Sequence, residues 1–225
     1  MHTHNHHHDG PRVFDESFWN ARYSEKQRIW SGRPNPQLVA EAEALAPGTA
    51  LDVGCGEGAD ALWLAARGWR VTGVDISTVA LARAAEHEAE LSATNNAAAP
   101  TVSWEHRDLT RDEPPAGFFD LVTAQYLHLP TDQREPLFRA LARAVAPGGT
   151  LLIVGHDPSD LNGEAPRPQL PDLYFTPEDI AALLDDESPG SWEHQVRQTR
   201  PREASGPDGA TLAVADAVYR GRRLS

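Results

Sequence analysis

The sequence has a single cysteine, no long apolar run and fewer basic than acidic residues. Cys55 stands alone, so the chain cannot form an internal disulfide, which fits a reducing compartment. No window approaches the roughly 20 apolar residues that a membrane-spanning helix needs. No apolar stretch typical of a signal peptide follows the N-terminal charges. We therefore expect a cytoplasmic protein without a membrane partner.

The charge balance argues against nucleic acid as the main partner. Lys and Arg number 20 against 33 Asp and Glu, which gives a net charge of −13. A polyanion is repelled by such a chain overall, although a local basic patch stays possible. The 225 residues, 40% hydrophobic and 24% charged, suit one ordinary globular domain.

Histidines crowd the N-terminus, within residues 1–10. Clustered imidazoles bind divalent metals, but a tag-like or disordered tail has the same composition. We expect a disordered tail over residues 1–10, with no metal site, and a single domain over residues 11–225; a metal-binding tail is the open alternative.

Strand-like and helix-like stretches alternate in the middle of the chain. The expected strands are residues 49–53, 70–74, 101–106, 118–123 and 150–154, and the expected helices are residues 59–67, 78–91 and 132–145, the last ended by residues 147–149. Ser77 is a good N-cap for the second helix. This alternation predicts βαβ units in a parallel, doubly wound α/β sheet.

The remainder has a different pattern. Its prolines predict a surface loop over residues 158–171, and Thr176 is expected to cap a helix. Residues 192–199 and 211–219 are expected to form an antiparallel hairpin at the sheet edge. This part of the chain carries three neighbouring arginines, Arg197, Arg200 and Arg202. We expect them to be solvated, with contact to an anionic acceptor as the alternative.

The most informative segment follows the first strand and contains Gly54, Gly56 and Gly58. Glycines there permit a tight turn and close approach of the backbone to a ligand. Asp75 follows about 20 residues later, at the end of the second strand, where a carboxylate accepts hydrogen bonds from ribose hydroxyls. The sequence therefore predicts a ligand with a ribose beside the first two strands.

The same turn fits the dinucleotide fingerprint, with Ala59 in the last position. Asp52 precedes the turn and Glu57 lies inside it, and two carboxylates disfavour a pyrophosphate. They favour a cationic nucleoside, and S-adenosylmethionine (SAM) carries an ammonium and a sulfonium. A dinucleotide site and an unliganded structural turn remain the alternatives.

Four motifs occur in order: Leu51–Gly58, Gly73–Ser77, Phe119–Val122 and Pro147–Leu151. Their sequence and spacing, over about 110 residues, resemble those of class I SAM-dependent methyltransferases. The resemblance implies a Rossmann-like, doubly wound seven-stranded sheet, mostly parallel with an antiparallel C-terminal strand. It implies SAM as cofactor, S-adenosylhomocysteine (SAH) as product, a small-molecule acceptor, and a monomer or homodimer.

The resemblance also implies roles for residues by their position in the motifs. Asp52 is expected to face the methionine ammonium, and Gly54 and Gly56 to let the backbone meet the methionine portion, with Cys55 as a small space-filling residue. The further cofactor-binding residues are Asp75 for the ribose, Ile76 and Leu109 against the adenine, Asp108 for the adenine amino group, and Gln125 and Tyr126 along the methyl-donor cleft. Asp108 as a solvated loop acid is the alternative.

An aromatic segment precedes the core, with Phe18, Trp19, Tyr23 and Trp30. It is similar to the N-terminal lid of tellurite, thiopurine and halide/thiol methyltransferases. We therefore divide the domain into a lid (11–36), a SAM-binding core (37–157) and an acceptor side (158–225), and expect Tyr23 and Trp30 to contact the cofactor. A helix packed on the sheet is the alternative.

His128 and His156 are the candidate catalytic residues, because they follow the fourth and fifth strands at the expected ligand edge. A hydroxyl or amine acceptor needs a group that takes its proton, whereas a thiolate does not. Purely structural roles for both histidines stay open, and Asp157 either orients His156 or caps the next turn. The sequence thus predicts a small-molecule methyltransferase; the alternatives are a thiol, halide or metalloid-oxyanion methyltransferase and a non-catalytic SAM-binding protein.

Overall fold

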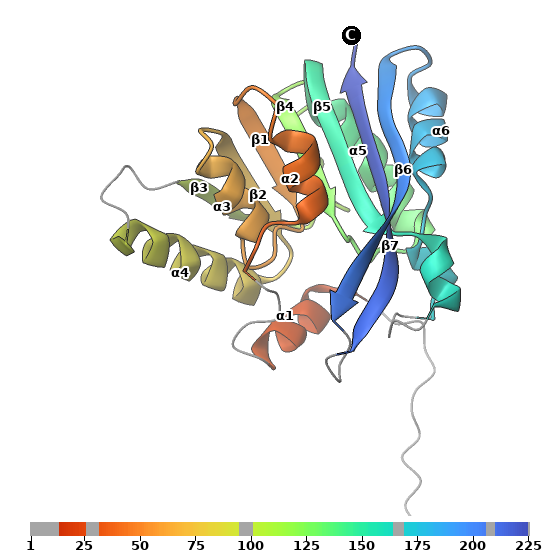
Figure 1. Ribbon diagram of the computed structural model, residues 1–225. Helices are drawn as coiled ribbons and strands as arrows, with labels where there is room; N and C mark the ends of the chain where they lie inside the picture. Colours follow the sequence, from red (N-terminus) through yellow and green to blue (C-terminus); the bar gives the residue numbers. More distant parts are fainter. Residues whose placement is uncertain (1–13, 26–31, 95–100, 164–168, 206–209, 225) are drawn as a thin grey trace, which may run out of the picture.

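The computed structural model describes residues 14–25, 32–94, 101–163, 169–205 and 210–224 (Figure 1). Its elements are α1 (Glu16–Ser24), α2 (Pro36–Ala42), β1 (Thr49–Val53), α3 (Ala59–Ala65), β2 (Arg70–Asp75), α4 (Thr78–Thr94), β3 (Val102–His106), β4 (Phe119–Gln125), α5 (Thr131–Ala144), β5 (Val145–His156), the 3-10 helices η1 (Pro158–Asn162) and η2 (Pro171–Leu173), α6 (Pro177–Glu187), β6 (Trp192–Ser205) and β7 (Thr211–Arg223). The His-rich residues 1–10 lie outside the described residues.

The strands form one seven-stranded sheet in the order β3-β2-β1-β4-β5-β7-β6. The pairs from β3 to β5 are parallel. Strand β7 runs antiparallel to both of its neighbours, β5 and β6. The predicted Rossmann-like sheet, mostly parallel with an antiparallel C-terminal strand, is confirmed.

The end of α5 differs from the prediction. The helix stops at Ala144, and Val145 has extended backbone angles. Val145 pairs with Phe119 of β4, so sheet pairing of a β-branched residue outweighs one more helical residue. Residues 147–149 therefore belong to the start of β5 and do not end the helix.

Two predicted helix starts are confirmed by their caps. The Ser77 hydroxyl accepts a hydrogen bond from the Ala80 amide at 3.1 Å. The Thr176 hydroxyl accepts from the Asp179 amide at 3.2 Å, and the Asp179 carboxylate accepts from the Thr176 amide at 2.7 Å. Each cap contributes about 1 kcal/mol to stability and fixes where its helix leaves the sheet.

Helices cover the sheet on both faces (Figure 1). On one face, α2 and α3 bury a core that includes Leu38, Leu64 and Val154. On the other, α5 and α6 bury a core that includes Leu141 and Ile153. Along β5, successive residues alternate between the two cores, as the two-residue period of a strand requires. None of the helices in the described ranges has the length and apolar character needed to cross a bilayer.

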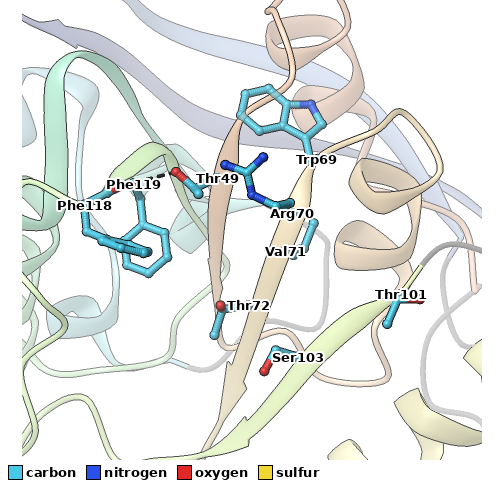
Figure 2. A pocket seen from close by; sticks show the side chains of 9 residues that line it. All are labelled: Thr49, Trp69, Arg70, Val71, Thr72, Thr101, Ser103, Phe118 and Phe119. Carbon is cyan, nitrogen blue, oxygen red and sulfur yellow. Dashed lines mark hydrogen bonds between the residues drawn. The ribbon is translucent and has the colours of Figure 1, made fainter.

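The connection between β3 and β4, residues 107–118, contains no helix. A groove of about 410 Å³ lies at the amino ends of the strands (Figure 2), lined by Thr49, Trp69, Arg70, Val71, Thr72, Thr101, Ser103, Phe118 and Phe119. The glycine turn lies at the opposite, carboxyl end of β1. The groove is therefore separate from the edge where ligands of open parallel sheets bind.

The carboxyl ends of the parallel strands meet at one edge of the sheet. Strands β1, β2, β4 and β5 end there, and α1 lies across this edge (Figure 1). The β6–β7 hairpin projects beyond the end of β5, with pairs from Pro201–Ala215 to Ser205–Thr211. The edge is thus bounded by the glycine turn, α1 and the hairpin.

Candidate active site

A tight glycine turn joins β1 to α3. Gly54, Gly56 and Gly58 have φ angles of +68°, +54° and +85°, which L side chains rarely adopt. The Gly54 amide donates to the carbonyl of Val74 at 2.8 Å, which fixes the turn to the end of β2. A Cβ at Gly54 would lie 2.5 Å from Cδ2 of Leu127. The turn needs glycine for both its conformation and its space.

Three acidic residues lie around this turn: Asp52, Asp60 and Asp75. Asp52 is 1% exposed, and its Oδ2 has no hydrogen-bond partner among the described residues. Burial raises the pKa of Asp52 well above its usual value, and the charges of Asp60 and Asp75 raise it further. Burial also raises the pKa of Asp60, to about 6. Such a cluster stabilises a cation and repels an anion.

Glu57, the acid inside the turn, does not join this cluster. Its buried carboxylate pairs with Arg83 of α4 at 2.9 Å. The expectation that Glu57 presents an open negative charge to the ligand is wrong, because α4 packs beside the turn and supplies a counter-ion. The charges of Asp52, Asp60 and Asp75 then oppose a pyrophosphate.

Asp75 holds the other side of the turn. Its Oδ2 accepts from the Gly56 amide and its Oδ1 from the Ser77 amide, both at 2.8 Å. Burial raises the pKa of Asp75, and these hydrogen bonds oppose the rise. Ile76 is half-buried next to it, and its carbonyl lies 3.0 Å from Nε2 of His106. Both residues lie beside the turn, where the resemblance expects the nucleoside.

The remaining nucleoside-side residues have partners within the protein. Burial raises the pKa of the Cys55 thiol well above its usual value, which suits a space-filling role. Asp108 accepts from the Thr110 amide and hydroxyl at 3.0 and 2.6 Å and pairs with Arg111 at 3.3 Å. Leu109 is buried in the core. The adenine roles of Asp108 and Leu109 stay predictions.

Asn35 links three parts of the site. Its amide donates to Oδ1 of Asp60 at 2.6 Å, and its side-chain nitrogen donates to Oε1 of Gln125 at 3.3 Å. Its side-chain oxygen accepts from the Gln37 amide at 2.8 Å and caps α2. Gln125 in turn donates to the hydroxyl of Thr123. The segment before α2 is thereby fastened to the glycine turn and to the end of β4.

Tyr126 follows β4 in a strained conformation. Its φ of +51° makes it the only residue other than glycine with a positive φ in the described ranges. That region costs an ordinary residue roughly 1–2 kcal/mol, and such strain concentrates at functional sites. Its hydroxyl accepts from a guanidinium nitrogen of Arg202 at 3.3 Å. Gln125 and Tyr126 both lie at the carboxyl edge, as expected, and their cofactor role stays a prediction.

The two candidate catalytic histidines lie close together. The ring centroids of His128 and His156 are 5.5 Å apart. The rings of Tyr126 and Tyr174 lie 4.7 and 6.1 Å from His156, and that of Trp19 lies 5.7 Å from His128. Aromatic rings from three segments therefore surround the imidazoles.

Helix α1 covers this aromatic cluster. The Asn20 side-chain oxygen accepts from the Ser77 hydroxyl at 2.7 Å, which joins α1 to the start of α4. Tyr23 is buried, with its ring 6.2 Å from that of Trp19. Trp30 lies outside the described residues. The cofactor contacts predicted for Tyr23 and Trp30 stay predictions.

Both carboxylate oxygens of Asp157 accept hydrogen bonds from residues other than His156. Asp157 accepts from the amide and hydroxyl of Ser159 at 3.0 and 2.6 Å and from the Thr199 hydroxyl at 2.7 Å. Of its two predicted roles, capping is the one that the structure shows.

Two of the three hairpin arginines are not solvated as expected. Arg200 pairs with Glu41 of α2, and Arg202 pairs with the buried Asp216 of β7 at 2.7 Å. The prediction is wrong for these two because α2 lies against the hairpin, so that Glu41 of α2 and Asp216 of β7 supply carboxylates to the arginines of β6. Arg197 is exposed.

The site accommodates the chemistry of SAM. The buried Oδ2 of Asp52, which has no partner within the described ranges, suits a cationic amino group, and the exposed Gly54 suits close approach of a ligand. No group of three or more metal-ligating side chains in the described part of the chain is arranged to hold a metal ion.

Comparisons with known proteins agree with this geometry. A family model described as a methyltransferase domain matches residues 50–149. The 2-heptyl-1-hydroxyquinolin-4(1H)-one methyltransferase of Mycobacteroides abscessus is 32% identical over 165 residues, which cover 68% of this chain and 70% of that protein.

Solved structures show the same fold. One, concerned with conversion of a disulfide bond into a thioacetal group during echinomycin biosynthesis, has a TM-score of 0.70 and 25% identity and covers 92% of both chains. The magnesium protoporphyrin IX methyltransferase of Synechocystis, solved with SAM bound, has a TM-score of 0.64 and 19% identity over 92% of this chain and 94% of that one. The chain belongs to the class I SAM-dependent methyltransferases.

Proposed function

We propose that this chain binds SAM at the carboxyl ends of β1, β2 and β4 and transfers the methyl group to a small-molecule acceptor beside His128 and His156. The observation that carries the proposal is the buried Oδ2 of Asp52, which has no partner in the described residues and lies among further carboxylates. Within a methyltransferase family, that electrostatic environment favours the methionine ammonium of SAM.

The residues at the turn contact different parts of SAM in this proposal. Asp52 attracts the ammonium, directly or through water, and Gly54 and Gly56 let the backbone approach the methionine portion. The other roles are those of Asp75 at the ribose, Ile76 and Leu109 against the adenine, Asp108 at its amino group, and Gln125 and Tyr126 along the cleft. When bound, SAM supplies a methyl group on a positively charged sulfonium sulfur, and the neutral thioether of SAH is a good leaving group.

Helix α1 acts as a lid in this proposal. It is held to the core by Asn20 and packs Trp19 against His128. Closing such an edge excludes water and aligns the acceptor, the main contributions that a protein makes to this displacement. Tyr23 and Trp30 are proposed as its cofactor contacts.

The acceptor class that fits is a small aromatic compound with a hydroxyl group. Aromatic walls favour a planar ring through stacking, and a hydroxyl gives up a proton that His128 or His156 can accept. The relative named above acts, by its name, on a hydroxyquinolone. A thiol or halide acceptor needs no such pair of imidazoles.

Transfer of labelled methyl from SAM tests the proposal across an acceptor panel. We expect phenols and hydroxyquinolones to be methylated, and substitution of His128 or His156 by Asn to lower the rate at least about 100-fold, the usual scale of acid–base catalysis. His194→Asn, outside the site, serves as the matched control. Transfer only to thiols, iodide or tellurite contradicts the acceptor class, and SAH binding without transfer to any acceptor indicates a non-catalytic SAM-binding protein.

A further inference from the structure

His156 and Asp216 occupy opposite positions on neighbouring strands. They are register partners in the antiparallel pair of β5 and β7. The Asp157 amide donates to the carbonyl of Ala215 at 3.2 Å, so His156 and Asp216 form a pair that does not exchange backbone hydrogen bonds. In such pairs the Cα atoms are about 4.5 Å apart, and the two side chains share a face and approach closely.

Asp216 is a buried carboxylate with one oxygen engaged. It is 0% exposed. Its Oδ2 accepts from Nε of Arg202 at 2.7 Å and from Nε2 of Gln37 at 3.1 Å. Its Oδ1 has no hydrogen-bond partner among the described residues. Leaving a buried carboxylate oxygen in this state costs free energy, so a donor is expected nearby.

The charged and titratable groups around His156 come from several elements. Arg202 of β6 contacts both Asp216 and Tyr126. The Tyr126 hydroxyl also interacts directly with the Asp216 carboxylate, and the Tyr126 ring lies against the imidazole with an interplanar angle of 31°. His128 and Tyr174 lie on its other sides. One guanidinium therefore holds two neighbours of the imidazole in place.

We propose that Asp216 is a positioning residue for His156. The two side chains share a face but form no hydrogen bond with each other in the structure; in the proposed active state a small rotation lets Oδ1 accept one ring N–H, so that the other ring nitrogen is left to receive the proton of the acceptor hydroxyl. That proton moves from oxygen to nitrogen, the resulting imidazolium keeps its first N–H on Asp216, and the proton later returns to solvent. The catalytic part of this role rests on the proposed function, whereas the pairing itself does not.

Histidine NMR on the full chain tests the pairing without SAM or an acceptor. In protein labelled with ¹⁵N-histidine, with His156 assigned by a His156→Gln variant, we expect one neutral tautomer for His156. We also expect its titration midpoint to fall by at least half a pH unit in Asp216→Asn, because an ionised carboxylate stabilises the imidazolium.

Asp185→Asn is the matched control. Asp185 lies 3.1 Å from Nε2 of His194, so this variant removes a carboxylate beside a different histidine and should leave the His156 midpoint unchanged. An unchanged His156 midpoint in folded Asp216→Asn overturns the proposal. If that variant does not fold, the wild-type spectrum decides, since the tautomer mixture of a solvated imidazole overturns it equally.

The kinetic consequence separates this proposal from the proposed function. With an acceptor in hand, Asp216→Asn should lower methyl transfer about tenfold or more with SAH affinity unchanged, and should add nothing in a His156→Asn background. A shifted midpoint without methyl transfer to any acceptor contradicts the proposed function and leaves the pair standing. Methyl transfer with an unchanged His156 midpoint contradicts the pairing with Asp216 and leaves the proposed function standing.

Discussion

The affinity for SAH should depend on pH through Asp60. Its carboxylate is partly buried, accepts from the Asn35 amide and raises the pKa of Asp52 by its charge. Burial raises its own pKa to about 6. A ligand ammonium beside Asp52 is bound best when Asp60 is ionised, so protonation of Asp60 competes with ligand binding.

The size of the effect follows from that pKa. If only the ionised form binds, the apparent Kd is multiplied by one plus the ratio of protonated to ionised Asp60, which is about 10 at pH 5 and about 0.1 at pH 7 for a pKa near 6. The affinity should therefore rise about tenfold between pH 5 and pH 7. In Asp60→Asn the rise should be smaller, because only the raised pKa values of Asp52 and Asp75 then contribute to it.

Calorimetric titration with SAH at several pH values measures this directly. The wild-type protein should release a proton on binding at pH 6, seen as a heat that varies with the ionisation enthalpy of the buffer. Glu193→Gln, which removes an exposed acid at the start of β6, at the opposite end of the sheet from the turn, should behave as wild type. A pH-independent affinity in the wild type, or an undiminished pH dependence in Asp60→Asn, refutes the coupling.

Further predictions concern the turn and the core. Because the pKa of Asp60 is raised on folding, the free energy of unfolding without ligand should fall as pH rises from about 4 to 6, by about 3 kcal/mol at most. Denaturant titrations should show a smaller fall in Asp60→Asn. An equal fall in this variant would contradict the raised pKa of Asp60. Asp75→Asn should weaken SAH binding about 10- to 100-fold in calorimetry, and an unchanged Kd would remove Asp75 from the site. Gly54→Ala forces a side chain at φ +68° beside Leu127 and should weaken SAH binding at least about tenfold, whereas wild-type binding would show that the turn relaxes freely. Leu141→Ala, at a 0% exposed position, should cost about 2–5 kcal/mol in denaturant unfolding without changing SAH affinity; a loss of affinity would mean that the core and the site are coupled.

Local physical rules predict much of this fold from sequence. The glycine turn, the acid at the end of β2 and the hairpin follow from backbone freedom, strand period and turn composition, and each is present. The caps at Ser77 and Thr176 are equally local, because a hydroxyl satisfies an amide three residues away.

Interactions between distant segments are not predictable in the same way. No residue near Glu57 in the sequence indicates its ion pair with Arg83, and none near Arg202 indicates its pair with Asp216, because helix packing and strand pairing bring these charges together. Asp60 has no distinctive sequence signal, since acids are common in the first turn of a helix. Asp216 did have one, as a lone acid within an apolar strand.

A crystal structure with SAH bound tests the central claim most directly. It should show the amino nitrogen of the ligand within hydrogen-bond distance of Asp52, or joined to it by one water, and both ribose hydroxyls on Asp75. Ligand density at the carboxyl edge with neither carboxylate in contact, or bound elsewhere on the protein, would contradict it.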